Sequence, residues 1–149
     1  METQATYPRP RPLPAGVTEA TQIPVDGGIV ARQDGALLMV HCAGGTEAGL
    51  AQRLSADGGR SWSAPEPVVG ERMAGASGCG LIRLASGRLA LYHGTPKTGW
   101  WLSTSADDGA TWAVAGRITD YPMYIPMYHS LIQLASGRLL IAGYWKTDE

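Results

Sequence analysis

Three histidines and a cysteine occupy related places along the chain, where their side chains could bind a metal ion or contact a ligand. His41 and His93 each lie six residues after a glycine in a turn-like segment, so we expect them at equivalent positions. His129 begins a later apolar segment, and Cys79 holds the corresponding place 50 residues earlier. Zinc sites use such ligands, but with short spacings that are missing here. We therefore expect polar residues along one rim and no metal site.

An aromatic segment, residues 121–128, carries three tyrosines and two prolines and follows Asp120. Tyrosine offers an apolar ring and a hydroxyl that forms hydrogen bonds. The segment therefore predicts either a sugar-binding wall that includes Asp120, Tyr121 and Tyr124, or a packed connection between two structural units.

An eight-residue pattern occurs twice, at 55–62 and at 105–112, with a spacing of 50 residues. An aspartate in a tight turn accepts hydrogen bonds from nearby backbone N–H groups, and glycine supplies a left-handed conformation. The tryptophan is expected to start and anchor the next strand. A catalytic residue is needed once, so the recurrence favours a structural role. The structural residues of the two turns are Ser55, Asp57, Gly59, Trp62, Ser105, Asp107, Gly109 and Trp112.

A second repeated element has the same period: residues 81–89 return as 131–139, with a fainter copy at 29–38. Each copy predicts two short strands around a glycine turn. Four antiparallel strands in about 50 residues are typical of a β-propeller blade. The prediction is an all-β partial propeller of about two and a half four-stranded antiparallel blades. An extended Pro/Arg-rich arm at 1–20 precedes the propeller part at 21–149, with blades at about 28–70 and 79–118 and a half blade at about 129–145.

Composition excludes several classes of protein. The chain has 149 residues, 44% of them apolar, and a formal net charge of −1, which indicates neither a nucleic-acid binder nor a membrane protein. The first residues hold no signal peptide, which points to the cytoplasm, although the sequence leaves the compartment unknown. Cys42 and Cys79 are too few for a disulfide scaffold, and we expect them to remain thiols.

The repeated turn, S-x-D-x-G-x-[ST]-W, resembles the Asp box of the sialidase (neuraminidase) superfamily, also called the BNR repeat. The resemblance covers roughly residues 20–145. It implies a six-bladed propeller, of which this chain would be the N-terminal part. It also implies an exo-sialidase-like glycoside hydrolase, which we expect to be inactive in isolation, and it implies no cofactor.

Strand direction places the glycine turns and Asp boxes on one face and the longer loops on the other. The resemblance implies an acid/base residue in the first long loop, where Glu47 is the acid present. The family's first arginine is missing, because the matching stretch, residues 22–24, reads Gln-Ile-Pro. Residues expected to contact a substrate on this face are His41, Arg72, His93, Asp120, Tyr121, Tyr124 and His129.

Two further interpretations remain open. One is a non-catalytic propeller module that binds a glycan or a protein. The other is a structural repeat unit that completes itself as a homo-oligomer through its open blade edges, where unpaired strands invite pairing.

Overall fold

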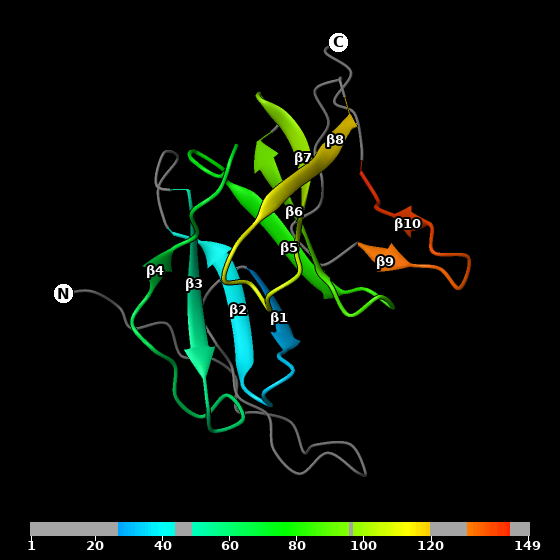
Figure 1. Ribbon diagram of the computed structural model, residues 1–149. Helices are drawn as coiled ribbons and strands as arrows, with labels where there is room; N and C mark the ends of the chain where they lie inside the picture. The colour runs from blue at the N-terminus through cyan, green and yellow to red at the C-terminus, as the bar shows by residue number, and fades with distance from the viewer. Residues whose placement is uncertain (1–26, 44–48, 96, 120–130, 144–149) are drawn as a thin grey trace, which may run out of the picture.

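The computed structural model describes residues 27–43, 49–95, 97–119 and 131–143 (Figure 1). These residues form ten strands, and they contain no helix. The predicted all-β class and its four-stranded antiparallel sheets are therefore confirmed.

The first sheet has the order β1-β2-β3-β4, and each strand pairs antiparallel with the next along the chain. Its strands are β1 (Gly27–Ala31), β2 (Leu37–Cys42), β3 (Leu50–Ser55) and β4 (Glu66–Pro67). β2 is buried along most of its length because neighbouring strands cover both of its edges and side chains cover its faces.

The second sheet repeats this order as β5-β6-β7-β8. Its strands are β5 (Gly78–Arg83), β6 (Leu89–Thr95), β7 (Gly99–Ser105) and β8 (Ala113–Thr119). A hairpin of β9 (Ile132–Gln133) and β10 (Leu139–Leu140) follows. The three units lie beside one another in chain order (Figure 1).

The turn between the first two strands of each unit has the same form three times. The φ angles of Gly35, Gly87 and Gly137 are 86°, 84° and 84°, in the left-handed region that glycine enters without a steric penalty. Each glycine N–H donates to the carbonyl three residues earlier. The fainter first copy of the sequence repeat is thus a full structural copy.

One expectation about the fourth strand is wrong. Trp112 does lie directly before β8, but β4 begins four residues after Trp62, at Glu66. Pro65 and Pro67 explain the difference, because proline has no N–H to donate to a strand ladder and is tolerated at a sheet edge.

The two large sheets share one hydrophobic core. β5 packs against β1 and β2, and a buried cluster combines Leu38 and Val40 of the first sheet with Leu81 and Leu91 of the second. The Cys79 thiol donates across this contact to the Val40 carbonyl at 3.7 Å. The chain thus buries its sheet faces against one another, which is how a repeated sheet unit acquires a core.

The third unit packs on the second through another cluster. Leu131 lies beside Ala90, Tyr92 and Trp100, and the Tyr92 and Trp100 rings meet edge to face with centroids 6.1 Å apart. Aromatic pairs favour this geometry because the positive ring edge meets the negative ring face.

The close approach of β1 and β5 gives the first testable prediction. A Cβ added at Gly28 would lie 2.6 Å from the backbone nitrogen of Leu81. We expect Gly28→Ala to lower the free energy of unfolding by about 1–3 kcal/mol, because backbone must move to admit the methyl group. Urea unfolding would measure the loss.

Gly116→Ala is the matched control, because a Cβ there meets nothing within 4 Å. It should change the free energy of unfolding by less than about 0.5 kcal/mol. Equal stability of the two variants would contradict the described contact between the sheets.

Candidate functional site

The first Asp box closes on a buried hydroxyl. Ser55, at the end of β3, is 2% exposed. Its Oγ donates to Asp57 Oδ1 at 2.8 Å and accepts from the Gly59 N–H at 2.8 Å. Asp57 also accepts from the Ser61 N–H at 2.9 Å and from the Ser61 hydroxyl at 2.6 Å. The turn is therefore closed by side chains rather than by a strand ladder.

The second Asp box repeats this network. Ser105 Oγ donates to Asp107 Oδ1 at 2.7 Å and accepts from the Gly109 N–H at 2.8 Å. Thr111 donates to Asp107 through its N–H at 2.9 Å and its hydroxyl at 2.6 Å. The two tryptophans differ: Trp62 Nε1 donates to the Gly59 carbonyl at 3.1 Å, whereas Trp112 Nε1 is buried and has no hydrogen-bond partner among the described residues.

Hydrogen bonds to the charged form keep both box carboxylates ionised. The hydroxyl and N–H of Ser61, followed by Ser55, hold the pKa of Asp57 well below its usual value. The corresponding bonds from Thr111 and Ser105 lower the pKa of Asp107 to about 2. A general acid or base is most effective with a pKa near the working pH, so these carboxylates suit a structural role.

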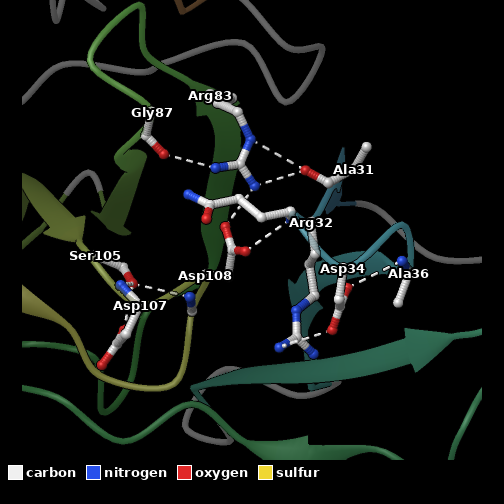
Figure 2. Close-up of polar contacts among 11 residues, drawn as sticks. Ala31, Arg32, Asp34, Ala36, Arg83, Gly87, Ser105, Asp107 and Asp108 are labelled. Atoms are coloured by element: carbon white, nitrogen blue, oxygen red, sulfur yellow. Dashed lines mark hydrogen bonds and ion pairs between the residues drawn. The ribbon is translucent and has the colours of Figure 1, made fainter.

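A bridge between the two large sheets starts at Asp108, the residue after the second box aspartate (Figure 2). Asp108 Oδ2 accepts from the Gln33 N–H at 2.8 Å, and Oδ1 accepts from Arg83 Nη2 at 2.6 Å. Arg83 also donates to the Ala31 carbonyl in β1 and, through Nη1, to the Gly87 carbonyl in its own turn. The bridge thus ties the second Asp box to the first glycine turn.

The Asp108 carboxylate is largely shielded from solvent and is paired with the positive charge of Arg83. Its side chain is 12% exposed, and that of Arg83 is 27% exposed. The Gln33 N–H, and then Arg83, lower the pKa of Asp108. Its φ of 55° lies in the left-handed region, where the first box has Gly58 at 73°. The aspartate therefore occupies a position that favours glycine, and the bridge gives a physical reason for it.

A related bridge joins the second sheet to the β9–β10 hairpin. Gln133, which corresponds to Arg83 in the repeat, accepts from the Ala85 N–H at 2.7 Å and donates to the Gly137 carbonyl at 3.2 Å. Ala85 corresponds to Gln33 in the repeat. In both units, a side chain of the following unit accepts a hydrogen bond from this turn N–H. Sequence reasoning missed Asp108, Arg83 and Gln133, although the Gly58/Asp108 difference between the boxes was a signal.

We call the other end of the sheets the loop-bearing end: β2 and β6 end there, β3 and β7 begin there, and the 68–77 connection lies there. His41 and His93 lie there at equivalent positions, but they are only 4% and 0% exposed. His41 Nε2 accepts from Arg53 at 3.4 Å, and His93 Nε2 shares a hydrogen bond with the Ser103 hydroxyl at 2.9 Å. Both imidazoles are buried within their sheets. Their contact with a substrate stays a prediction.

Arg72, another predicted contact residue, lies on the 68–77 connection with its guanidinium 4.9 Å from the centroid of the Trp101 ring. Arg117 approaches the same ring at 5.6 Å. Sequence analysis did not single out Arg117 or this cluster. Trp100 and Trp101 alternate along β7, so that Trp100 is 3% exposed while Trp101 is half-buried.

The remaining predicted site residues lie outside the described residues: Glu47, Asp120, Tyr121, Tyr124 and His129. Within the described ranges, no three His, Cys, Asp or Glu side chains are grouped as a metal ion would require. Neither Cys42 nor Cys79 forms a disulfide. The described part of the chain also has no helix with the length and apolar character needed to cross a membrane.

Comparison with known proteins gives a fold neighbour and no family. No protein-family model matches the chain, and no curated protein matches it. The chain is similar to a crystal structure of a protein of unknown function from Dyadobacter fermentans DSM 18053, with a TM-score of 0.55 and 14% identity. The match covers 77% of this chain and 44% of that one, so the chain spans less than half the length of its neighbour. At this identity the likeness concerns the fold alone.

The buried hydroxyl of the second box gives a prediction. We expect Ser105→Ala to lower the free energy of unfolding by about 1–3 kcal/mol, because the buried Gly109 N–H loses its acceptor. Ser86→Ala, at an exposed turn position, is the control and should stay within about 0.5 kcal/mol of the parent. Thermal and urea unfolding of the two variants would measure this, and an unchanged Ser105→Ala variant would show that the hydroxyl does not hold the turn.

The buried imidazole of His93 predicts a pH dependence. Burial lowers the pKa of His93 to about 4 from its ordinary 6.5, partly opposed by the nearby Arg72 backbone. Between these values the unfolded chain binds a proton that the folded chain does not. The free energy of unfolding should therefore fall as the pH drops from about 6.5 to about 4, by roughly 3 kcal/mol in total.

His93→Gln should abolish this loss, because glutamine does not titrate and can still bond the Ser103 hydroxyl. The box aspartates affect stability in a lower pH range. Because their pKa values are lowered in the folded chain, protonating them reduces the free energy of unfolding only as the pH falls from about 4 towards 2. Urea unfolding at a series of pH values would measure both windows. The same slope between pH 6.5 and 4 in parent and variant would rule out His93 as its source.

Proposed function

We propose that the chain supplies consecutive blades of an Asp-box β-propeller of the sialidase type, and that its loop-bearing end recognises a glycan. The observation that carries the proposal is the doubled Asp-box network. Two sheets in chain order close their third turn through the same serine, aspartate and hydroxyl contacts, with matching lengths.

The packing between the sheets supports a radial arrangement. At the inner strands the backbones approach closely, because Gly28 of β1 lies against Leu81 of β5 with no room for a Cβ. Farther out, Val68, Met73 and the ring of Trp112 fill the same core. A close backbone approach at the inner strands and large side chains farther out are what a wedge-shaped unit requires, and wedges stacked in one direction fan around an axis.

Glycan recognition is the function that this arrangement supports best, because propellers bind ligands with the loops of a rigid scaffold. The loop-bearing end carries the side chains of Arg72 and Trp101, and the sequence predicts that the tyrosines of residues 121–128 belong to the same end; such side chains suit hydroxyl-rich ligands. Glycoside hydrolysis is a second candidate. It rests on the Asp-box resemblance and on Glu47, the acid in the first long loop, and it requires a partner group on the sugar's other side.

A glycan array probed with the full chain tests the proposal. We expect saturable binding to a defined glycan class, without release of sugar. Tyr124→Ala should lose this binding, whereas Arg88→Ala should retain it, since Arg88 bonds Thr104 near the glycine turn at the opposite end. An array without specific binding, or equal loss in both variants, would contradict glycan recognition at this end.

Any sugar release from the array would be followed with Glu47→Gln and with Glu66→Gln as its matched control. Hydrolysis by the proposed acid/base requires that the first variant be inactive and the second unchanged. Equal activity of both variants would remove Glu47 from the proposal.

A further inference from the structure

The interface between the first two sheets holds both cysteines of the chain. Cys79 of β5 is 6% exposed and belongs to the buried cluster between the sheets. Cys42 ends β2, is partly exposed, and packs against the same cluster. Alternate residues of a strand share one face, and Leu38 and Val40 precede Cys42 on the face that this cluster covers. The two cysteine side chains therefore enter one interface from opposite sheets.

The inner strands β1 and β5 run side by side in the same direction (Figure 1). The Arg83 guanidinium, at the end of β5, donates to the Ala31 carbonyl, at the end of β1. Earlier in both strands, Leu81 of β5 lies against Gly28 of β1. Cys79 comes two residues before Leu81, so it lies beside the first residues of β1.

The start of β1 is paired with the end of β2, which brings Cys79 to the level of Cys42. Gly27 pairs with His41, the residue before Cys42. Because Gly27 has no side chain, the Cys79 thiol can approach β2, and its Sγ lies 3.7 Å from the Val40 carbonyl oxygen. His41 projects to the other face of β2, so Cys42 carries the next side chain along the face that Cys79 approaches.

The two thiols differ in their exposure to solvent. Cys42 is partly exposed, whereas Cys79 is buried. An oxidant in solution therefore meets the Cys42 sulfur first, because the site of cysteine oxidation follows exposure and thiolate character. Cys79 is placed to attack the product from inside the fold.

The pair belongs to one interface of the repeat. Gly94 holds the place of Cys42 in the second unit, and His129 holds the place of Cys79 in the third. The turn end of the interface that contains the cysteines is already bridged by Arg83 and Asp108. A covalent bond between the cysteines would fix the loop-bearing end of the same interface.

We propose that low-molecular-weight disulfides oxidise Cys42 and Cys79 to an intramolecular disulfide. The Cys42 thiolate attacks one sulfur of the oxidant, RSSR, and releases RS⁻. The Cys79 sulfur then attacks the Cys42 sulfur of this mixed disulfide, releases the second RS⁻ and gives up its hydrogen bond to the Val40 carbonyl. The released thiolates take up the two protons that the cysteines lose, so the dithiol and RSSR become a protein disulfide and two RSH.

Equilibration of the full chain with mixtures of reduced and oxidised glutathione tests the placement of the thiols. The fraction of intramolecular disulfide is measured by mass spectrometry after acid quenching and alkylation, in the folded chain and in urea. We expect the effective concentration of the pair to be at least about tenfold higher in the folded chain, because the fold holds both thiols in one interface. An effective concentration equal to that in urea, or lower, would overturn the proposal.

Thermal unfolding of the reduced and oxidised chain gives a second measurement. Oxidation should raise the melting temperature by about 5–10 °C, because the bond closes the long loop between residues 42 and 79 in the unfolded chain. Cys79→Ala should stop at the mixed disulfide on Cys42 and show no such rise.

Cys42→Ala is the matched variant and should take up glutathione at least about tenfold more slowly than Cys79→Ala, since its remaining thiol is buried. The melting temperature of each reduced variant shows whether it is folded. Equal uptake by the two folded variants, or a disulfide that joins two molecules, would contradict the proposal. Neither experiment reads glycan binding, so their failure would leave the proposed function untouched.

Discussion

A buried serine hydroxyl at the end of the third strand is the interaction on which the rest of each sheet depends. Ser55 and Ser105 are 2% exposed, and each satisfies a glycine N–H while donating to an aspartate. Burial raises the cost of leaving such groups unpaired, so the turn has one satisfactory conformation. In the second sheet that conformation sets Gly109 against Leu38 of the first sheet. A local turn thereby becomes a contact between sheets.

The two ends of the sheets use polar groups differently. At the turn end, carboxylates accept hydrogen bonds from neighbouring backbone and hydroxyl groups, and these hydrogen bonds stabilise the turns. At the loop-bearing end, His93 is buried while Trp101, its direct strand partner, is half-buried under Arg72. Exposure therefore increases across the sheet from β6 to β7. The proposed glycan recognition is therefore assigned to this second end, where the side chains of Trp101 and Arg72 remain partly exposed.

The sequence predicted what repeats and missed what differs between repeats. The 50-residue period, the strands and the paired roles of Asp57 and Asp107 could be read from motifs whose contacts are local. The bridge through Asp108 could not, because it joins residues 25 and 75 positions apart and replaces Gly58 of the first box. The cluster of Arg72, Trp101 and Arg117 could not be predicted for the same reason. Its contacts depend on the register of β7 and β8 and on the path of the 68–77 connection. The shortness of β4 follows from Pro65 and Pro67, which cannot donate to a strand ladder.

The left-handed Asp108 makes the two boxes unequal despite their common hydrogen-bond pattern. With Gly58 in this position, the first box folds its own turn but offers no carboxylate to a neighbour. With Asp108, the second box folds the same turn and also recognises the unit before it. The eight-residue motif thus has two roles. Both copies form the same turn, and the second copy also contacts the preceding unit through Asp108. Side chains between successive units therefore make each interface different from the next. Exchanging the two copies of the motif would remove the Asp108 carboxylate from the interface that uses it.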